Sequence, residues 1–422
     1  MSVFCFGASS GSLRKFSVRI VMLEFDFTCV EAKLRLGSCV VFKKIFKTFV
    51  LVCCLTCVQH ASAWGERGHS IVSQVAARLL VSRVANGQNV LKPFLTKELM
   101  LAHLSNVPDI YWRSLPAEIS KPIASTHFVD LEYFGIAKSE DVTVLTVPEA
   151  LKRLKDNCTK SLLKEKVSCA ETVHNTEIFE AAGSAPWRVE QFAKRLKTSL
   201  NKLQIDENHA PGKQAALQRK KNGEQAFGKM TQEQERYVVE ALVNAGLLAH
   251  FVGDLSQPLH TTTDYDGFTA GLGGLHAYFE TDVVNAVDLG LALRVHEFAK
   301  NLSLKSISGR SSINGTTPLE LAFRLSADSF SQLDVLKELD QKYSIVERSS
   351  EKGGLRIPGK RKQASQVASF FEPLIVKRLA AAAVVLAEIY FQMWKDSGSP
   401  DLSAFDSYVY PLQPELVPVN YY

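Results

Sequence analysis

The sequence predicts an all-α protein built as a single multi-helix domain. Three stretches, residues 70–84, 232–255 and 366–395, carry apolar residues at helical spacing. The last one contains Pro373, near which we expect a break in the helix. No convincing alternating pattern indicates a strand. At 422 residues, with 46% hydrophobic and 22% charged residues, the composition excludes disordered and fibrous classes.

The first 63 residues differ from the rest in charge and cysteine content. They hold eight Lys and Arg against three acids, which accounts for the formal net charge of +5, and six of the eight cysteines. A short basic stretch, 43–47, precedes an apolar run over 48–58 and then Ala61-Ser62-Ala63. This order is typical of a signal peptide cleaved after Ala63, and the run is too short to span a bilayer; a buried segment or a membrane anchor is the alternative. Residues 1–40 are better explained by a mis-called start codon than by a structural role.

We therefore expect an exported protein, periplasmic or secreted, that begins at Trp64 and keeps no stable membrane anchor. Residues 64–422 are neutral overall, so net charge argues neither for nor against nucleic acid, and no protein partner is implied. In an oxidising compartment Cys158 and Cys169 can form a disulfide, with two free buried thiols as the alternative. Two basic stretches, 197–229 and 347–366, are predicted to be solvated insertions, and nucleic-acid contact is the minority interpretation. The end of the chain, 401–422, is expected to pack as an irregular tail.

Metal-ligand residues concentrate in one part of the sequence. His250 and Asp254 are four residues apart on the predicted helix 232–255, so both side chains leave the same face. His260 follows closely, and His276 and Glu280 repeat the same spacing. Imidazole nitrogen and carboxylate oxygen both suit zinc. One such pair is more often an ion pair or a core histidine, whereas five ligand-type residues within 31 positions favour a metal site.

Two further segments add ligand-type residues. Trp64 and His69 lie in the string WGERGH at the expected new amino terminus, where a neutral α-amino group is itself a possible ligand. Asp109 and His127 add a second carboxylate and a further imidazole. Taken singly, Asp109 is also explained as a turn residue after a proline, and His127 as a hydrogen-bonded core histidine.

Together these motifs resemble the S1/P1 nuclease family of zinc-dependent enzymes, which shares a superfamily with bacterial zinc phospholipases C. The resemblance rests on W-G-x-x-G-H, then P-D with a nearby Arg, then HFVD, HFVGDLSQPLH, and L-H with an acid four residues on, in this order over residues 64–284. It implies an all-α domain of the phospholipase C/P1 nuclease type with a trinuclear zinc cleft.

The resemblance also implies a role for each matching residue. One zinc would be held by Asp109, His127, His250 and Asp254. A second would be held by the amino nitrogen and carbonyl oxygen of Trp64, by His69, and by Asp254 as a bridge. A third would take His260, His276 and Glu280.

The activity implied is hydrolysis of phosphodiester bonds in single-stranded DNA or RNA to 5′-phosphate products by a metal-bound hydroxide. Asp109 would orient the hydroxide and Arg113 would neutralise charge on the phosphoryl oxygens. Phe128 and Asp130 would bind the base by stacking and by accepting a hydrogen bond, although plain core packing also explains Phe128.

Three positions depart from the nuclease pattern. Glu280 stands where the nucleases usually have Asp and the phospholipases have Glu, Gly274 stands where the nucleases tend to have Asn, and Arg113 follows Asp109 by four residues rather than three. In contrast, His69 has the nuclease spacing from the amino terminus. The sequence therefore favours a nuclease acting on single strands or nucleotides, with a zinc-dependent phospholipase C as the alternative and a non-catalytic zinc-binding protein as a third hypothesis.

Overall fold

The computed structural model describes residues 64–136, 144–159, 162–169, 174–208, 230–308 and 315–421. The predicted signal peptide with its upstream extension, and positions 209–229 of the first basic stretch, lie outside the described residues. Contacts join the described part of the chain into one unit.

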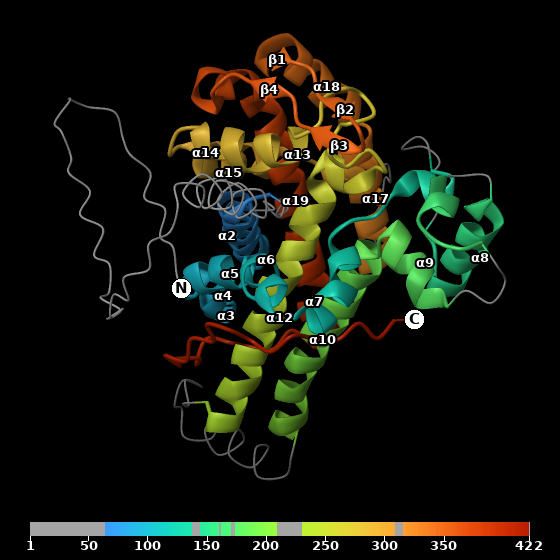
Figure 1. The fold of residues 1–422 in the computed structure, drawn as a ribbon. Coiled ribbons are helices and arrows are strands. Elements are labelled where there is room, and N and C mark those ends of the chain that lie inside the picture. The colour runs from blue at the N-terminus through green and yellow to red at the C-terminus, as the bar shows by residue number, and fades with distance from the viewer. Residues whose placement is uncertain are drawn as a thin grey trace, which may run out of the picture. The chain divides into compact units, whose positions relative to one another are not determined.

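The described residues are mostly helical, as the sequence predicts (Figure 1). The longer helices are α2 (Glu66–Arg83), α8 (Val147–Cys158), α10 (Ala185–Asn208), α12 (Gln232–Ser256), α15 (Leu291–Asn301), α17 (Pro318–Phe330) and α19 (Ala368–Asp396). Shorter α-helices are α3 (Gly87–Val90), α4 (Lys92–Thr96), α5 (Glu98–Leu104), α6 (Val107–Ile110), α7 (Ala117–Ala124), α9 (Asn175–Ala182), α13 (Leu275–Ala277), α14 (Val284–Ala286), α16 (Leu304–Ser308) and α18 (Leu333–Leu339).

Short 3-10 and π turns connect these helices. The 3-10 turns are η1 (Trp112–Ser114), η2 (Ser125–His127), η3 (Leu131–Phe134), η5 (Leu162–Glu165), η6 (Pro258–Thr261) and η9 (Ala364–Gln366). Two single π turns, η7 (Tyr278–Val283) and η8 (Asp340–Ser344), interrupt helical segments. Such turns are frequent at functional sites, and η7 carries one of the expected metal ligands.

Two of the three predicted long helices match the structure closely, and the third needs a correction. α2 starts at Glu66, four residues before the predicted start, and α12 ends one residue after the predicted end. α19 runs without a break through Pro373, contrary to the prediction. Since the helix begins only five residues earlier, at Ala368, the proline removes a single hydrogen bond near the amino-terminal end, where little helix precedes it.

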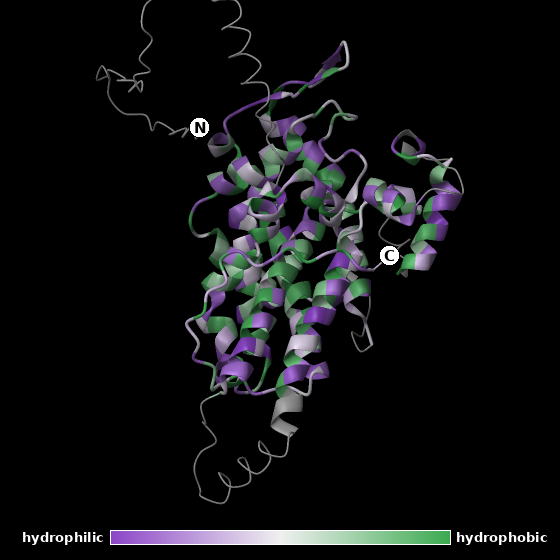
Figure 2. Cartoon of the chain, turned by 60° about the horizontal axis from the view of Figure 1, so that its bottom comes forward, coloured by the Kyte–Doolittle hydropathy of each residue, from purple (hydrophilic) through white to green (hydrophobic). Residues whose placement is uncertain are grey.

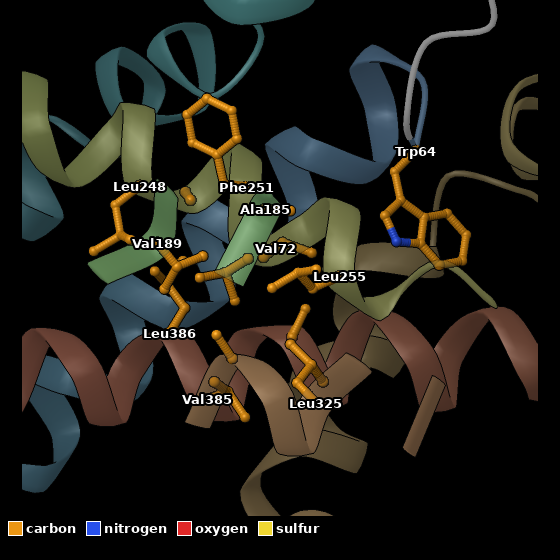
Figure 3. Close-up of a cluster of buried hydrophobic side chains, with 14 of the residues drawn as sticks. Trp64, Val72, Ala185, Val189, Leu248, Phe251, Leu255, Leu325, Val385 and Leu386 are labelled. Atoms are coloured by element: carbon orange, nitrogen blue, oxygen red, sulfur yellow. The ribbon is translucent and has the colours of Figure 1, made fainter. Parts of the chain in front are cut away.

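The core lies where five helices meet. Figure 3 shows Val72 of α2, Val189 of α10, Phe251 of α12, Leu325 of α17 and Leu386 of α19 converging, and each is 0–1% exposed. Figure 2 shows hydrophobic and hydrophilic residues alternating around the long helices, the pattern of helices that bury one face. This packing fixes α12, which carries the central ligands, against its neighbours.

One helix, α12, is long and apolar enough to cross a membrane by length and composition. In the structure, 83% of its most apolar 18-residue window is buried inside the protein. It packs along α10, where Asn244 bonds to Ser199 and Arg195 bonds to Asn244. We therefore interpret α12 as the core helix of the unit.

Four short strands form between Ile345 and Arg361, mostly within the second basic stretch, where no strand is predicted from the sequence. β1 (Ile345–Glu347) pairs with β4 (Lys360–Arg361), and β2 (Ser350–Lys352) pairs with β3 (Leu355–Ile357), both antiparallel. Strands of two or three residues are too short to show an alternating pattern, and their residues are mostly exposed. The first basic stretch also needs a correction: α10 continues to Asn208, and Leu200 and Leu203 are buried rather than solvated.

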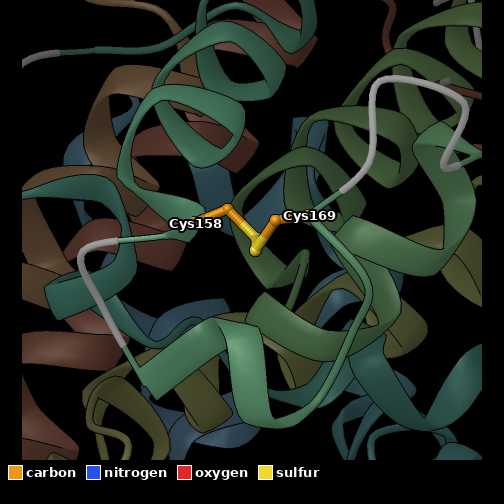
Figure 4. Close-up of a disulfide and its surroundings, with 2 residues drawn as sticks. All are labelled: Cys158 and Cys169. Carbon is orange, nitrogen blue, oxygen red and sulfur yellow. A yellow bond between two sulfur atoms is a disulfide. The ribbon is translucent and has the colours of Figure 1, made fainter.

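Cys158 and Cys169 form a disulfide, as predicted (Figure 4). The chain after α19 has no regular structure, also as predicted, and its backbone oxygens accept hydrogen bonds from buried side chains. Arg188 donates to the carbonyl oxygen of Val417, and Trp112 donates to that of Pro414. These bonds hold the tail against α10 and η1.

Candidate metal centre

α12 presents two of the expected ligands from one face. His250 and Asp254 are both fully buried, and His250 Nε2 lies 3.3 Å from Asp254 Oδ2. The helix begins at a capping box at Thr231 and ends at Ser256, two residues before Pro258. Because the helix is capped at its start and buried throughout from Asn244 to Ser256, these two side chains are fixed in direction.

Three histidines of the centre are each oriented by a different backbone carbonyl oxygen. In each, Nδ1 lies next to a carbonyl oxygen and Nε2 faces other ligand-type groups. The pairs are His250 with Ser105 at 2.8 Å, His260 with His127 at 2.6 Å, and His276 with Tyr265 at 2.8 Å. A carbonyl accepts only from a protonated nitrogen, so the proton is on Nδ1 and the lone pair of Nε2 is available to a metal.

The first predicted ligand group comes together from three segments. His127 Nδ1 lies 2.9 Å from His250 Nε2, 3.1 Å from Asp254 Oδ2 and 3.6 Å from Asp109 Oδ1. His250 Nε2 lies 3.8 Å from Asp109 Oδ1. A tetrahedron with metal–ligand bonds of about 2.0–2.1 Å has edges of roughly 3.3–3.4 Å. The spacings among His127, His250 and Asp254 lie close to that edge length, and these three side chains form one candidate metal group. Asp109, predicted as the fourth ligand of this group, forms a candidate group with His69 and His250 instead.

The second predicted group adjoins the first through Asp254. His69 Nε2 lies 3.4 Å from Asp254 Oδ1, the oxygen that does not face His127. Gly253 leaves room for the His69 ring, because a Cβ at Gly253 would lie 2.7 Å from His69 Nδ1. Trp64 is buried, and its indole nitrogen donates to Ser256 Oγ at 2.8 Å. The structure thus brings Trp64 and His69 to the same end of α12 as the carboxylate predicted to bridge two ions.

The third predicted group is also brought together. His276 Nε2 lies 2.8 Å from Glu280 Oε2 and 3.0 Å from His260 Nε2, and His260 Nε2 lies 3.7 Å from Glu280 Oε2. Gln257 donates to Glu280 Oε2 and fixes the carboxylate. Three converging ligands with no fourth among the described side chains match the geometry of a catalytic metal site, which keeps one position for substrate or water.

Burial sets the protonation of the first group. Desolvation, with the neighbouring cationic groups, lowers the pKa of His127 and His250 well below the ordinary histidine value, so both rings stay neutral and able to bind a metal. Desolvation and the nearby carboxylate of Asp109 raise the pKa of Asp254 well above its usual range. Placing a negative charge at Asp254 is therefore costly, and a divalent cation would offset that cost.

The third group carries more charge. Although burial opposes it, the neighbouring imidazoles of His276 and His260 lower the pKa of Glu280 to about 2. The Glu280 carboxylate in turn raises the pKa of His276 against the effect of burial, whereas burial lowers the pKa of His260. Within the described residues, two buried carboxylate oxygens, Asp254 Oδ1 and Glu280 Oε1, have no hydrogen-bond partner. Both belong to the ligand groups, which fits a metal ion as their missing partner.

Three groups of side chains in the described structure could thus hold metal ions. They are His69 with Asp109 and His250, His127 with His250 and Asp254, and His260 with His276 and Glu280. All eight of the predicted side-chain ligands are among them. Their donor set of imidazoles and carboxylates is one that zinc accepts.

A cavity of about 240 Å³ opens beside the ligand groups. His127, His260 and His276 line it together with the three further residues predicted from the resemblance, Arg113, Phe128 and Asp130. Arg113 Nε lies 2.9 Å from Asp109 Oδ1, so the four-residue spacing still places the guanidinium at the centre. A cavity with a few convergent polar groups is the usual form of a small-ligand site.

Lys166 and Tyr265 also line the cavity, and the sequence analysis missed both. Lys166 Nζ lies 3.0 Å from Asp130 Oδ2, and it belongs to the segment that the disulfide closes. Burial raises the pKa of Asp130 to about 7, against the opposing effect of Lys166. Since 36 residues separate these two residues, no local spacing could have predicted the pair.

Comparisons with known proteins do not assign this chain to a family. No family model matches the chain, no curated protein matches it, and no solved structure matches it. The fold and the three ligand groups define a mostly helical protein with a candidate metal centre.

Proposed function

We propose that this chain is a zinc-dependent phosphodiesterase of the S1/P1 nuclease type, which hydrolyses single-stranded DNA or RNA to 5′-phosphate products. The observation that carries the proposal is a cavity that is lined by histidines of two ligand groups, His127, His260 and His276, and whose other walls hold Phe128, Asp130 and Arg113. We further propose that the protein is exported and cleaved after Ala63, which would create the α-amino group of Trp64 beside His69.

The residues of the centre divide into holding and reacting groups. Zinc bound there would act as a Lewis acid and bring the pKa of water toward neutrality. Asp109 lies at the edge of the first group and is positioned to orient the attacking water. Arg113, fixed by its ion pair with Asp109, would stabilise the charge that develops on the phosphoryl oxygens.

Three side chains would form the part of the cavity that binds the nucleotide base. The ring of Phe128 offers a stacking surface, and base stacking on an aromatic side chain contributes roughly 1–3 kcal/mol. Asp130 would accept a hydrogen bond from the base edge, and the Lys166 ammonium beside it holds the carboxylate in place. Because every base has a flat face, this arrangement accepts single strands of many sequences.

The alternative function is a phospholipase C acting on lipid headgroup phosphodiesters. The third ligand group ends in Glu280, which is the residue type of the phospholipase pattern. Both functions use the same phosphodiester chemistry, so the metal centre alone does not separate them. The cavity walls favour the nuclease because they combine an aromatic ring with a carboxylate.

The test assays purified protein beginning at Trp64, with zinc, on single-stranded DNA and on phosphatidylcholine side by side. We expect DNA to be cleaved to 5′-phosphate products, and chelation by EDTA to abolish cleavage. His260→Gln should remove activity, whereas the matched variant His296→Gln, on α15 away from the centre, should keep it. Hydrolysis of phosphatidylcholine alone would assign the phospholipase function, and turnover of neither substrate by zinc-loaded protein would leave a non-catalytic metal-binding protein.

A further inference from the structure

The paired strands of residues 345–362, which we name the basic hairpin, carry an excess of positive charge. Six of these eighteen residues are Lys or Arg and two are Glu. Two of the cations are engaged in ion pairs, Lys360 with Glu347 and Arg361 with buried Asp340. Within the described residues, no carboxylate lies within ion-pair distance of the other four, which are Arg348, Lys352, Arg356 and Lys362. These four cations are therefore available to an anionic partner.

The basic hairpin is fixed to the loop that leads into His276. The backbone N–H of Gly359 donates to the carbonyl oxygen of Gly273 at 2.9 Å, and that of Ser349 donates to Gly271 at 3.0 Å. Arg361 donates to the carbonyl oxygens of Leu272 and Gly273. Gly273 is three residues before His276, so the attachment lies within about 11 Å of that ligand along the chain.

The close fit between hairpin and loop depends on Gly274. This residue has a φ of +84°, which a side chain rarely adopts, and a Cβ there would lie 3.0 Å from Pro358 Cβ. The bonds and the close approach hold the basic hairpin at the edge of the metal centre. A strand that leaves the cavity at this edge would therefore pass the basic hairpin.

Aromatic side chains connect the cavity with the basic hairpin. Tyr265, 52% exposed, lines the cavity, and its ring centre lies 5.9 Å from that of His276. Three residues further, the ring of Phe268 lies under the guanidinium of Arg356, 5.2 Å from ring centre to Cζ. Cations interleaved with aromatic rings form the surface that single-stranded nucleic acids bind, through phosphates and stacked bases.

We propose that the basic hairpin binds the phosphate backbone of a single-stranded nucleic acid whose reacting nucleotide occupies the cavity. The inference rests on the proposed function and adds that substrate length matters: a strand that reaches past Tyr265 gains contacts that a dinucleotide cannot make. Three large apolar side chains of the basic hairpin, Val346, Leu355 and Ile357, are exposed, against six Lys and Arg, and this excess of cations favours phosphates as the partner.

The experiment compares zinc-loaded wild type with the triple variant R348Q/K352Q/R356Q. Its matched control is K155Q/K305Q/K395Q, which removes the same charge from exposed positions on α8, α16 and α19. Binding of a labelled phosphorothioate oligo(dT)30 is followed by fluorescence anisotropy at 50 and 200 mM salt. Each phosphate contact on a single strand contributes about 0.7 to the slope of log affinity against log salt. The wild type should therefore lose about 20-fold more affinity over this range than the hairpin variant, and the control should behave as wild type.

Hydrolysis gives the second measurement. We expect the ratio of kcat/KM for a 30-mer to that for a dinucleotide to fall at least several fold in the hairpin variant. R348K/R356K keeps the charge and should restore the ratio, which separates charge from folding of the hairpin.

An unchanged salt slope and an unchanged ratio would overturn the inference, while cleavage by the wild type would leave the proposed function standing. Salt-dependent binding that needs the hairpin cations, without any cleavage, would support the inference and reject the nuclease. Binding to phosphatidylserine vesicles in place of the oligonucleotide, lost in the hairpin variant, would overturn it in favour of a membrane.

Discussion

Gly253→Ala tests the proposed second metal site without replacing a proposed ligand. The added Cβ would lie 2.7 Å from His69 Nδ1, whereas ordinary contacts begin near 3.4 Å, so the ring must move by about 0.7 Å. The same ring also stacks on His250, with 4.2 Å between ring centres, which restricts how it can move. His69 therefore has to leave its position beside Asp254.

The expected magnitude follows from how narrow metal-ligand distances are. Metal–ligand bonds tolerate about 0.2 Å, so a shift of about 0.7 Å removes His69 from the coordination sphere. Mutation of a residue that only supports a metal ligand typically lowers metal affinity by about 10–100-fold. We expect at least this loss of affinity at the proposed second site. Folding stability should change less, because Ala favours the helix by about 1 kcal/mol and this offsets part of the overpacking.

Zinc content by mass spectrometry and zinc affinity by competition with a chelator measure the effect. Gly246→Ala is the matched control: it lies on the same helix, and the nearest atoms to its Cβ would belong to Leu104 and Leu101, which are not ligands, with Leu104 Cβ at 2.4 Å. The control should lose about 1–3 kcal/mol of stability to overpacking and keep all its zinc. If Gly253→Ala binds as much zinc as wild type with equal affinity, His69 is not a metal ligand.

Further predictions address the other parts of the centre. Asp254→Ala should lose zinc and stability together, since metal binding contributes to folding free energy, and calorimetry with and without zinc checks this. Arg113→Ala should keep zinc and lower kcat on a phosphodiester by about 10²-fold, and an unchanged kcat contradicts the role assigned to Arg113. Phe128→Ala should mainly raise KM for single-stranded DNA, and an unchanged KM contradicts the role assigned to Phe128. The pKa of Asp130 is raised to about 7, so its ionised form disappears below that pH: KM for nucleotides should rise as pH falls through 7, and Asp130→Asn should flatten this dependence. Because the pKa of Asp130 is raised in the folded protein, protonated Asp130 favours the folded state. This stabilisation is fully present below a pH of about 4 and is lost as the pH rises toward 7. One residue added before Trp64 should lower zinc content and activity, and a secreted protein whose intact mass shows another start contradicts the cleavage site.

The sequence predicted the parts of the centre that depend on local spacing. His250 with Asp254 and His276 with Glu280 are each four residues apart, and a helical turn brings such pairs together regardless of the rest of the fold. Lys166 could not be predicted, because its approach to the cavity depends on tertiary packing.

Local patterns also explain the two errors in secondary structure. The sequence predicts a break in the helix near Pro373. A proline in the sequence does not reveal how far upstream its helix begins, and α19 begins only about one turn earlier. The strands of the basic hairpin are two or three residues long and pair at register Ser350 to Ile357 and Lys352 to Leu355. A hairpin this short gives no periodic signal, and the two glycines at its tip, Gly353 and Gly354, were the available indication of a turn.

The centre couples segments that are otherwise far apart in the chain. Asp254 lies 3.4 Å from His69 of α2 and 3.1 Å from His127 of η2. His260 of η6 donates a hydrogen bond from Nδ1 to the carbonyl oxygen of His127, which orients its ring. A cation among these groups would offset the buried charge of Asp254, whose pKa is otherwise raised by desolvation. Its binding would then draw α2, η2 and α12 together, so metal content and the stability of this whole region should change in parallel. Apart from the bond between His260 Nδ1 and the carbonyl oxygen of His127, the third ligand group is held by Gln257 and by the loop that the basic hairpin supports, and we expect it to lose its metal at a different chelator concentration from the other two.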